Sequence, residues 1–312
     1  MIINTMHLSV IIPVYNAENS IYPLVKEIRD VLHLYKMEII LVNDGSKDKS
    51  ERICEQIAGE NSMVKFISLR KNFGEHNAVL CGLNYAEGDY AVIVDDDFQN
   101  PPAEIIRLFN EAEKGYDVVY SKYHQKKHNL YRNTMSRLTN QVANMLMSKP
   151  RDLYLSSFKI IRKEVVNEII KYKGPFPYID GLVLRTTNNI KSIYIDHHER
   201  MTGKSNYTFQ KLFSLYLNMF LNFSVRPLRI FTIAGVLIFF LGMGLATYFI
   251  ISKLTSQEVP GWTSIVLLIL LLSGFQIVFL GLIGEYLGKQ YMDQNNTPQW
   301  VIKKVITGND KR

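Results

Sequence analysis

Hydrophobic and polar positions follow two alternating periods over the first 120 residues. Short apolar runs typical of buried strands lie at residues 8–15, 38–44, 64–69, 90–96 and 116–122. Apolar positions spaced three and four apart predict helices near 17–34, 48–60, 75–87 and 101–113. Strands that alternate with helices predict an α/β fold, with a mostly parallel sheet covered by helices on both faces.

Two later segments extend this pattern. Residues 157–170 contain an apolar run followed by helical spacing, which predicts a further strand and helix. Residues 123–147 predict a loop and then a helix with a basic face. The cations on that face are Lys126, Lys127, Arg132 and Arg137.

Two long uncharged stretches dominate the last third of the chain. Residues 230–251 and 262–284 are each about 22 residues long, enough to cross ~30 Å of hydrocarbon at ~1.5 Å per residue. A pair of buried core helices is the alternative. The tandem arrangement, divided only by a short polar stretch, favours a transmembrane hairpin.

Basic residues flank this predicted hairpin on both sides. Arg226 and Arg229 precede it, whereas the connecting loop has only Lys253, offset by Glu258. The cations after it are Lys289, Lys303, Lys304, Lys311 and Arg312. The positive-inside rule therefore predicts a multi-pass protein of the inner (cytoplasmic) membrane, with both termini and the first 225 residues in the cytoplasm.

The segment before the hairpin is basic and amphipathic. Residues 200–257 contain no Asp or Glu but six Lys or Arg. Residues 204–228 are rich in Phe, Leu, Tyr and Met, which predicts a helix at the bilayer surface, with a core helix as the alternative. The predicted parts are a domain at 1–203, this juxtamembrane helix, a hairpin at 229–285 and a cytosolic tail at 286–312.

Composition narrows the choice of partner. The chain has 312 residues, 47% of them hydrophobic, a formal charge of +7 and a pI of about 9.1. This balance indicates an anionic partner; because much of the basic charge flanks the hairpin, anionic lipid accounts for it and we expect no nucleic acid. Cys54 and Cys81 match no metal or redox spacing, which predicts a reducing compartment. The N-terminus lacks the features of a signal peptide.

Three adjacent aspartates follow the apolar run that begins at Tyr90. On a strand, Asp95 and Asp97 project to one side and Asp96 to the other. Two carboxylates on one side can bind a hard divalent cation, Mg²⁺ or Mn²⁺, which in turn bridges a diphosphate. A solvated acidic turn is the alternative. The position after a hydrophobic strand and before "FQNPP" favours the metal site.

Polar residues end two other predicted strands, in "VYN" at 14–16 and "VNDGS" at 42–46. In open α/β sheets, ligands bind beyond the carboxyl ends of the strands. Asp44 can accept hydrogen bonds from a base or ribose, with Gly45 allowing close approach, although a common turn explains both residues equally well. Gly-rich phosphate motifs are absent from the sequence, so metal and side chains must hold any nucleotide.

A polar and basic cluster precedes the predicted surface helix. It consists of Arg200, Lys204, Ser205 and Tyr207. Cations beside a membrane can contact lipid headgroups. They can equally close over the phosphates of a substrate.

Together these motifs resemble the family-2 glycosyltransferases with a GT-A (Rossmann-like) fold. More narrowly, the chain resembles the polyprenyl-phosphate glycosyltransferases, which include dolichol-phosphate mannose synthase and the bacterial undecaprenyl-phosphate sugar transferases of the GtrB and ArnC type. "VIIPVYNAEN" is the opening strand, and "LVNDGSKD" resembles V-D-D-G-S-x-D with Asn43 in place of the first aspartate.

The remaining motifs extend the resemblance along nearly the whole chain. "LRKNFG" resembles the R-N-x-G segment, with Lys71 where arginine is usual, and "VDDDFQNPPAEI" resembles D-x-D-L-Q-x-P-P-E, with Phe98 in place of leucine. "ERMTGKSNY" resembles R-x-x-G-x-S-x-Y, and "GEYLGKQY" resembles G-E-Y-x-G-x-x-Y. The combination is highly specific, although each motif alone is not.

The resemblance implies functional residues at matching positions. Metal and diphosphate are expected at Asp95 and Asp97, and a loop at 200–207 is expected to cover the donor phosphates. The donor site is expected to contain Pro13, Tyr15, Asn16, Glu18, Asp44, Gly45, Ser46, Lys71, Asn72, Gly74, Asp95 and Asp96. The family also implies a UDP-sugar donor, a homo-oligomer (a tetramer) and a product used in the cell envelope, including lipopolysaccharide.

One departure from the family concerns the catalytic base. Many relatives have an aspartate directly before the phenylalanine of "SSFK", but this chain has Ser157. Asp152 and Asp180 are the substitutes, beside Asp97, in the predicted catalytic set.

The chemistry of the expected acceptor reduces the need for a base. A lipid monophosphate has a second pKa of about 6, so its attacking oxygen is largely anionic at neutral pH. The greater difficulty is its repulsion from the donor diphosphate, which the metal, Arg200 and Lys204 would relieve. The candidates for holding the acceptor phosphate are Lys122, Arg132 and Arg137.

Two other functions remain open. The same fold can extend a polysaccharide or a lipid-linked glycan, but a processive synthase usually has more spans and a Q-x-x-R-W motif, which this sequence lacks. A non-catalytic membrane partner of a flippase is the second alternative. The acidic triplet and the cations Arg200 and Lys204 argue against it.

Overall fold

A computed structural model of the chain describes residues 6–123, 153–196, part of 233–251, and 261–307. The chain divides into one unit of Met1–Asn206 with Asn296–Arg312, and a second of Tyr207–Asn295. The first unit contains the sheet, and the second contains helix α10.

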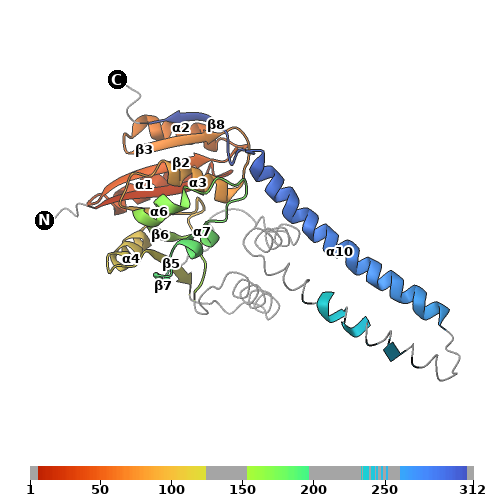
Figure 1. Ribbon diagram of the computed structural model, residues 1–312. Helices are drawn as coiled ribbons and strands as arrows, with labels where there is room; N and C mark the ends of the chain where they lie inside the picture. Colours follow the sequence, from red (N-terminus) through yellow and green to blue (C-terminus); the bar gives the residue numbers. More distant parts are fainter. Residues whose placement is uncertain are drawn as a thin grey trace. The chain divides into compact units, whose positions relative to one another are not determined.

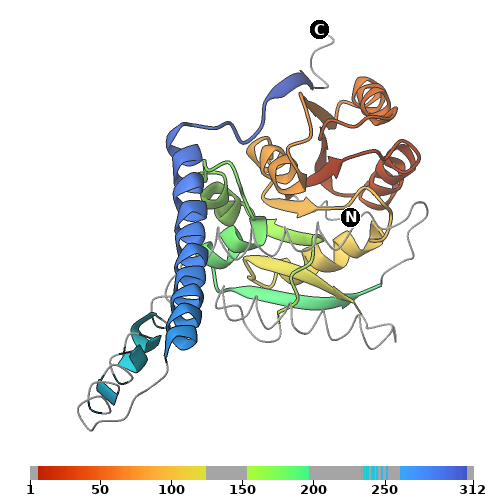
Figure 2. The ribbon, with the colours of Figure 1, turned by 90° about the vertical axis from the view of Figure 1, so that its right-hand side faces the viewer.

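The first unit is an α/β domain built on a mostly parallel sheet (Figure 1), as the alternating pattern predicts. The order is β7–β5–β6–β4–β1–β2–β3–β8, and Figure 2 shows it running from β8 in blue to β7 in green. The strands are β1 (His7–Val14), β2 (Lys36–Asn43), β3 (Val64–Leu69), β4 (Tyr90–Ile93), β5 (Val118–Tyr123), β6 (Lys159–Arg162), β7 (Ile190–Ile195) and β8 (Ile302–Ile306).

The directions of the strands decide which residues meet at each edge of the sheet. β1 pairs in parallel with β2 and β4, and β2 with β3, so these four strands end at one edge, called here the carboxyl edge. β6 runs antiparallel to β4, and β8 antiparallel to β3. The first residues of β6 and β8 therefore lie at the carboxyl edge as well.

Helices cover both faces of the sheet, and this explains the continuous apolar runs. Every residue of β1 after His7 is buried, because alternate side chains enter the two different helix layers. Val10 and Ile12 pack with α1, α2 and α4, whereas Ile11 lies against α3. The helices of this unit are α1 (Ile21–Val31), α2 (Ser50–Glu60), α3 (Glu75–Asn84), α4 (Ala103–Ala112), α6 (Lys163–Ile169) and α7 (Ile179–Thr186).

The segment predicted as a C-terminal tail contributes an edge strand. β8 adds to β3 and returns the chain to the first unit after α10. This strand was not predicted from the sequence. Two adjacent lysines, Lys303 and Lys304, lie between its apolar residues, and lysines are typical of edge strands.

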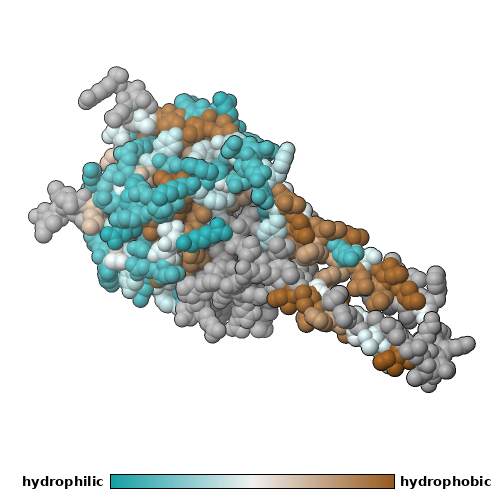
Figure 3. Space-filling view, in the orientation of Figure 1, coloured by the Kyte–Doolittle hydropathy of each residue, from teal (hydrophilic) through white to brown (hydrophobic). Residues whose placement is uncertain are grey.

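In the second unit, α10 (Trp262–Gln294) is one continuous helix of 33 residues that contains the second predicted span. Apolar side chains line its exposed surface, including Ile265, Leu268, Ile277 and Leu280 (Figure 3). Within the portion of the chain that the structure describes, no helix is both long and apolar enough to cross a membrane. The basic helix predicted within 123–147 and the surface helix at 204–228 lie outside the described residues.

Candidate functional site

The predicted site residues gather where β1, β2 and β4 end. The turns after these strands carry Asn16, Asp44 and Asp95, and the parallel pairing brings them to one edge. Lys159, the first residue of β6, pairs with Ile93, the last residue of β4. The segment that precedes β6 therefore reaches the same edge, from a distant part of the sequence.

The acidic triplet lies in a turn beyond the strand. β4 ends at Ile93, so the prediction of a strand through residue 96 is wrong at its carboxyl end. The alternation of side chains along a strand therefore does not place Asp95 and Asp97 on one side. Instead the Gln99 amide donates to Asp97 Oδ1 at 3.1 Å, and Phe98 has a φ of 62°. The chain turns directly after the triplet, at Phe98, and the carboxylate of Asp97 caps this turn.

Asp95 lies at the centre of a hydrogen-bond network. Its Oδ2 accepts from Ser157 Oγ at 2.5 Å and from Asn100 Nδ2 at 3.1 Å. Asn100 Oδ1 accepts from the Tyr123 hydroxyl at 2.8 Å, and that hydroxyl lies 3.0 Å from Ser156 Oγ. Ser157, which occupies the family's aspartate position, thus orients the predicted metal carboxylate. Asn100, Ser156 and Tyr123 were not predicted in this role from the sequence.

The remaining aspartate of the triplet joins β4 to β1. The Tyr15 amide donates to Asp96 Oδ2 at 2.9 Å. Asn16 has a φ of 55°, its amide donates to Ser46 Oγ at 3.0 Å, and its Oδ1 accepts from the Lys47 amide at 2.8 Å. The turns after β1, β2 and β4 are therefore tied directly to one another.

Asp44 fixes the loop before α3. Its two carboxylate oxygens accept from the amides of Phe73 and Gly74, at 2.7 and 2.8 Å. Burial raises the pKa of Asp44 above its ordinary value of 3.8, and the two amide hydrogen bonds offset only part of this. Gly45 has a φ of 65°, and a Cβ there would lie 2.5 Å from the carbonyl carbon of Lys71. Gly45 was predicted to allow close approach of a ligand; in the structure it allows close approach of this loop.

The other predicted donor residues lie beside this loop or in the adjoining turns. Pro13 is buried within β1, and Lys71 and Asn72 are exposed, with Lys71 Nζ 5.1 Å from the ring centre of Phe73. The Glu18 amide donates to Asp48 Oδ2, and Glu18 Oε2 accepts from the Lys49 amide, both at 3.1 Å. Glu18 therefore joins the start of α1 to the start of α2.

Asp180, one of the predicted substitutes for the base, is occupied by an ion pair. Its Oδ1 accepts from the Tyr120 hydroxyl at 2.9 Å and from Lys159 Nζ. Burial keeps the pKa of Tyr120 well above 10, so the phenol remains a proton donor. A proton on Asp180 would leave the Lys159 ammonium, whose side chain is 3% exposed, without a counter-charge. This arrangement favours a structural role for Asp180.

Two further groups at the start of α3 were not singled out from the sequence. Desolvation, together with the negative charge of Asp95, raises the pKa of Glu75 to about 7, although its side chain retains exposure to solvent. Desolvation lowers the pKa of His76 to about 4, so its ring is neutral and packs edge-on against Tyr178 at 5.1 Å. Their position directly after the predicted donor stretch Lys71–Gly74 was the available signal.

The structure does not join Lys122 to the acidic turn. Its ammonium lies 5.0 Å from the ring centre of Tyr194 on β7. Its neighbours Ser121 and Tyr123 point to the other face of β5, where they bond with Ser156. The other predicted site residues lie outside the described residues: Arg132, Arg137, Asp152, Arg200, Lys204, Ser205 and Tyr207.

The chemistry of the acidic turn fits a hard divalent cation. Asp95 and Asp97 supply carboxylate oxygens, the ligands that Mg²⁺ and Mn²⁺ prefer. Among the described residues, no three His, Cys, Asp or Glu side chains converge as a complete metal cage. Two carboxylates suit instead a site that a substrate's phosphate oxygens complete, since Mg²⁺ is usually held by one or two carboxylates plus phosphates.

Comparison with protein families identifies two matching regions. Residues 9–170 match the model of glycosyl transferase family 2, and residues 226–289 match the GtrB C-terminal hairpin. The first match covers the chain from β1 through α6, and therefore the acidic turn. The second includes the first part of α10.

Several relatives are similar over nearly the full length. The undecaprenyl-phosphate 4-deoxy-4-formamido-L-arabinose transferase of Proteus mirabilis is 32% identical, with 96% of this chain and 93% of the relative covered. The enzyme of the same name from Photorhabdus laumondii is 34% identical, with 96% and 94% covered. The glycosyltransferase YkcC of Bacillus subtilis is 30% identical, with 97% and 95% covered.

Solved structures share the fold at lower sequence identity. Glucosyl-3-phosphoglycerate synthase from Mycobacterium tuberculosis, in complex with Mn²⁺ and UDP-glucose, superposes with a TM-score of 0.52 at 17% identity. The match covers 69% of this chain and 77% of that one. This likeness supports the prediction of a GT-A-like α/β domain.

Proposed function

The chain belongs to glycosyl transferase family 2 and is a glycosyltransferase, and we propose that it transfers a sugar from a UDP-sugar to undecaprenyl phosphate with inversion. The observation that carries the proposal is the acidic turn at the carboxyl edge, in a chain whose full length matches undecaprenyl-phosphate sugar transferases. A lipid-linked sugar of this kind serves cell-envelope glycan synthesis or modification.

In this proposal Asp95 and Asp97 hold a divalent cation together with the donor diphosphate. The cation would offset negative charge on the departing nucleoside diphosphate. Ser157 and Asn100 keep the Asp95 carboxylate in position, at 2.5 and 3.1 Å. The solved UDP-glucose and Mn²⁺ complex of a protein with this fold supports a pairing of metal and UDP-sugar.

The nucleotide would bind over the turns after β1 and β2. Asn16 and Ser46 form one wall, and the loop Lys71–Gly74, which Asp44 fixes, forms the other. A carboxylate has about four lone-pair positions, so Asp44 can accept a bond from a base or ribose in addition to those from Phe73 and Gly74. Gly45 lets the two walls approach closely.

The acceptor phosphate would attack the anomeric carbon directly. A phosphate oxygen forms the new bond to carbon, and the bond from that carbon to the donor diphosphate breaks, which inverts the configuration. Because the attacking oxygen is already anionic near neutral pH, the ion-paired Asp180 and the serine at 157 are compatible with catalysis. Like charges ~4 Å apart repel by about 4 kcal/mol at an effective dielectric of about 20, so cations must surround the reacting groups.

Those cations are assigned to segments outside the described residues. Arg200 and Lys204, with Ser205 and Tyr207, would close over the donor phosphates. Arg132 and Arg137 are the main candidates for the acceptor phosphate, because Lys122 lies against Tyr194. Asp152 remains a proposed accessory base.

We further propose that residues 230–251 and 262–284 form a membrane hairpin with the catalytic domain on the cytoplasmic face. The uncharged composition of both segments, the basic flanks and the family match to a C-terminal hairpin support this topology. It would bring the nucleotide sugar and the lipid phosphate to one side of the membrane. A homotetramer is the proposed assembly, on the resemblance alone.

Mass spectrometry of the reaction product tests the function. The full-length protein, in vesicles containing undecaprenyl phosphate, would be supplied with a panel of nucleotide sugars and Mg²⁺ or Mn²⁺. We expect one donor to yield an undecaprenyl-phosphate sugar. Elongation of a pre-existing glycan, or no lipid product from any donor, would contradict the proposal.

A further inference from the structure

The C-terminal strand β8 contains a bulge at a basic residue. Its ladder with β3 pairs Ser68 with Lys304 and Leu69 with Ile302, so Lys303 is the extra residue. Neighbouring side chains on a regular strand point to opposite faces, and a bulge changes this direction. Here both lysines reach helix α2: Lys303 Nζ lies 2.9 Å from Glu51 Oε1, and Lys304 Nζ lies 3.0 Å from Glu55 Oε1.

Only the first of these ion pairs continues into the molecule. Glu51 Oε1 also accepts from Ser68 Oγ at 2.8 Å. Ser68 Oγ in turn accepts from Asn43 Nδ2 at 3.3 Å, and Asn43 Oδ1 accepts from the Ser46 amide at 3.3 Å. Ser46 Oγ then accepts from the Asn16 amide at 3.0 Å, so hydrogen bonds lead from β8 to the turn after β1.

The polarity of this chain of hydrogen bonds requires an amide at position 43. Ser68 has one hydroxyl proton, which it donates to Glu51, so its oxygen is left to accept. The Asn43 amide supplies the necessary donor, whereas an aspartate would compete with Glu51 for the same proton. Asn43 and Ser68 are both fully buried, so a second carboxylate there would lie out of water beside the first. Asn43, at a position where the family pattern has an aspartate, therefore supplies the donor that Ser68 needs when its own proton is given to Glu51.

The direction of the pKa shift of Glu51 agrees with its hydrogen bonds to Lys303 and Ser68. Partial burial alone would raise the pKa of Glu51, but the hydrogen bonds from Lys303 and Ser68 hold it below its ordinary value of 4.5. Glu51 is thus a stable anion that accepts from both sides.

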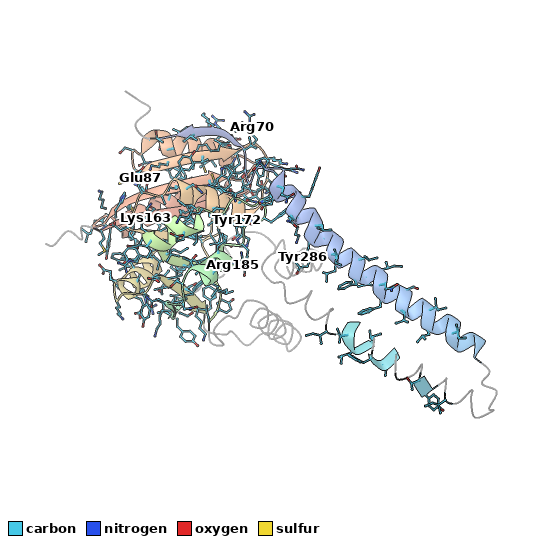
Figure 4. All side chains as sticks on the ribbon, in the orientation of Figure 1. Arg70, Glu87, Lys163, Tyr172, Arg185 and Tyr286 are labelled. Atoms are coloured by element: carbon cyan, nitrogen blue, oxygen red, sulfur yellow. The ribbon has the colours of Figure 1, made fainter. Side chains whose placement is uncertain are left out.

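The same C-terminal segment also holds two loops by their backbones. The amide of Arg70, the residue just before the donor loop Lys71–Gly74, donates to the Val301 carbonyl at 2.8 Å. Figure 4 shows Arg70 at the carboxyl edge of the sheet. Gln299 Nε2 donates to the carbonyls of Tyr172 and Gly174, at 3.0 and 2.8 Å. Residues 299–303 therefore contact the segment before the donor loop and the segment that leads to α7.

We propose that Lys303, Glu51, Ser68 and Asn43 are positioning residues that fix the Asn16–Ser46 wall of the donor site, and that β8 is thereby part of the construction of that site. The inference rests on the proposed nucleotide-sugar function. It adds residues that contact no substrate, and a strand whose Lys303 is 252 residues from Glu51 in the sequence.

Lys303→Met and Lys304→Met form a matched pair of test variants. The two lysines are neighbours on β8, their side chains are 52% and 47% exposed, and each has one glutamate partner on α2. Isothermal titration of the full-length protein in detergent, with UDP and Mn²⁺, would measure the Kd. We expect Lys303→Met to raise it about three- to tenfold, the range typical of residues that act without contacting the ligand. Lys304→Met should leave the Kd for UDP unchanged, and Lys303→Arg, which keeps the positive charge, should keep the Kd of the unmodified protein.

Thermal unfolding and steady-state kinetics separate positioning from stability. We expect equal melting temperatures for the two methionine variants, and an increase in donor KM without a matching loss of kcat for Lys303→Met only. Asn43→Asp should likewise weaken UDP binding. Equal effects of Lys303→Met and Lys304→Met on the Kd, or none from either, would overturn the proposal. If the unmodified protein binds no UDP, the proposed function itself fails, and this result is distinct from the others.

Discussion

Strand β2 has a buried carboxylate near each end, and the two are held in different ways. Glu38, towards the amino end, accepts from Ser9 Oγ and from the Glu87 amide, both at 2.6 Å, and pairs with Lys65 at 2.8 Å. Asp44, directly after the carboxyl end, is held by two backbone amides. Figure 4 labels Glu87 and Arg70, which mark the two opposite edges of the sheet.

The pKa values of the two acids shift in opposite directions. Burial alone would raise both, but the hydrogen bonds from Lys65 and Ser9 hold the pKa of Glu38 below 4.5, whereas that of Asp44 lies above 3.8. Glu75, near Asp44's edge, is raised further, to about 7. Perturbation of this kind is typical of functional sites. At the amino edge the buried carboxylate is paired with a cation, whereas Asp44 at the carboxyl edge is held by backbone amides.

The largest expected effect comes from removing a predicted metal ligand. Asp97→Ala should lower kcat/KM roughly a thousandfold, because it removes several kcal/mol of charge stabilisation and each ~1.4 kcal/mol is a factor of ten. Its melting temperature should fall only slightly, since half-buried Asp97 gives up one hydrogen bond, from the Gln99 amide, worth about 1 kcal/mol. Kinetics per folded molecule, with unfolding followed by circular dichroism, would measure both.

Asp152→Asn and Asp180→Asn are the comparison variants for this prediction. Each should lose less activity than Asp97→Ala, because the acceptor phosphate needs little help from a base. A greater loss in either variant would identify a required base and contradict the assignment.

The next effect concerns the close approach after Asp44. Gly45→Ala should lower the free energy of unfolding by at least about 3 kcal/mol, because the new Cβ would lie 2.5 Å from Lys71 backbone. It should also weaken UDP binding at least about tenfold by displacing the donor loop. Chemical denaturation and calorimetric titration measure these quantities.

Gly115→Ala provides the control for Gly45. Gly115 also has a positive φ, 100°, but nothing lies within 4 Å of its Cβ position. It should show only the backbone strain, about 1–2 kcal/mol, with normal UDP binding. Equal losses of unfolding free energy and of UDP affinity in the two variants would show that the close contact of Gly45 with Lys71 matters for neither.

A smaller effect is expected at the amino edge. Lys65→Met should destabilise the protein by about 2 kcal/mol, because it leaves Glu38 buried without its cation; this is less than for a fully buried pair, since the Lys65 side chain is 19% exposed. The kcat at 25 °C should not change. Lys114→Met, which removes an exposed pair with Glu111, should cost less than about 1 kcal/mol.

The smallest effect is the pH dependence of stability. Because the folded-state pKa of Glu38 is lowered, the unfolded chain binds more protons below about pH 4.5, and stability is lost as the pH falls. The folded-state pKa of Asp44 is raised instead, so above pH 3.8 the folded chain binds more protons than the unfolded chain. The contribution of Asp44 to stability therefore falls as the pH rises from 3.8 through its folded-state pKa. Each slope is at most about 1.4 kcal/mol per pH unit.

Single variants can resolve these opposed slopes. Glu38→Gln should make the loss of stability in acid shallower, and Asp44→Asn should make the rise in stability from pH 4 to pH 6 steeper. Denaturation series at several pH values measure both. The same sign of change in the two variants would remove the distinction between the ends of β2.

Sequence patterns predicted most of the sheet and its edge. The continuous apolar run in residues 8–15 and the helical spacing that follows are local properties, and parallel strands necessarily bring "VYN", "VNDGS" and "VDDD" together. They failed where pairing is non-local. β4 ends at Ile93, which pairs with the first residue of β6, and no local signal shows that β6 enters antiparallel between β4 and β5.

The sequence by itself determined the alternation of strands and helices, the acidic and polar strand ends, and the family to which the chain belongs, because these depend on residue type and spacing. Only the tertiary structure decided that Ser157 orients Asp95, that Lys159 occupies Asp180, and that Lys303 on a bulged edge strand reaches Glu51. These contacts join residues 21 to 252 positions apart. Strand order and direction bring them together, and neither is encoded within a local window.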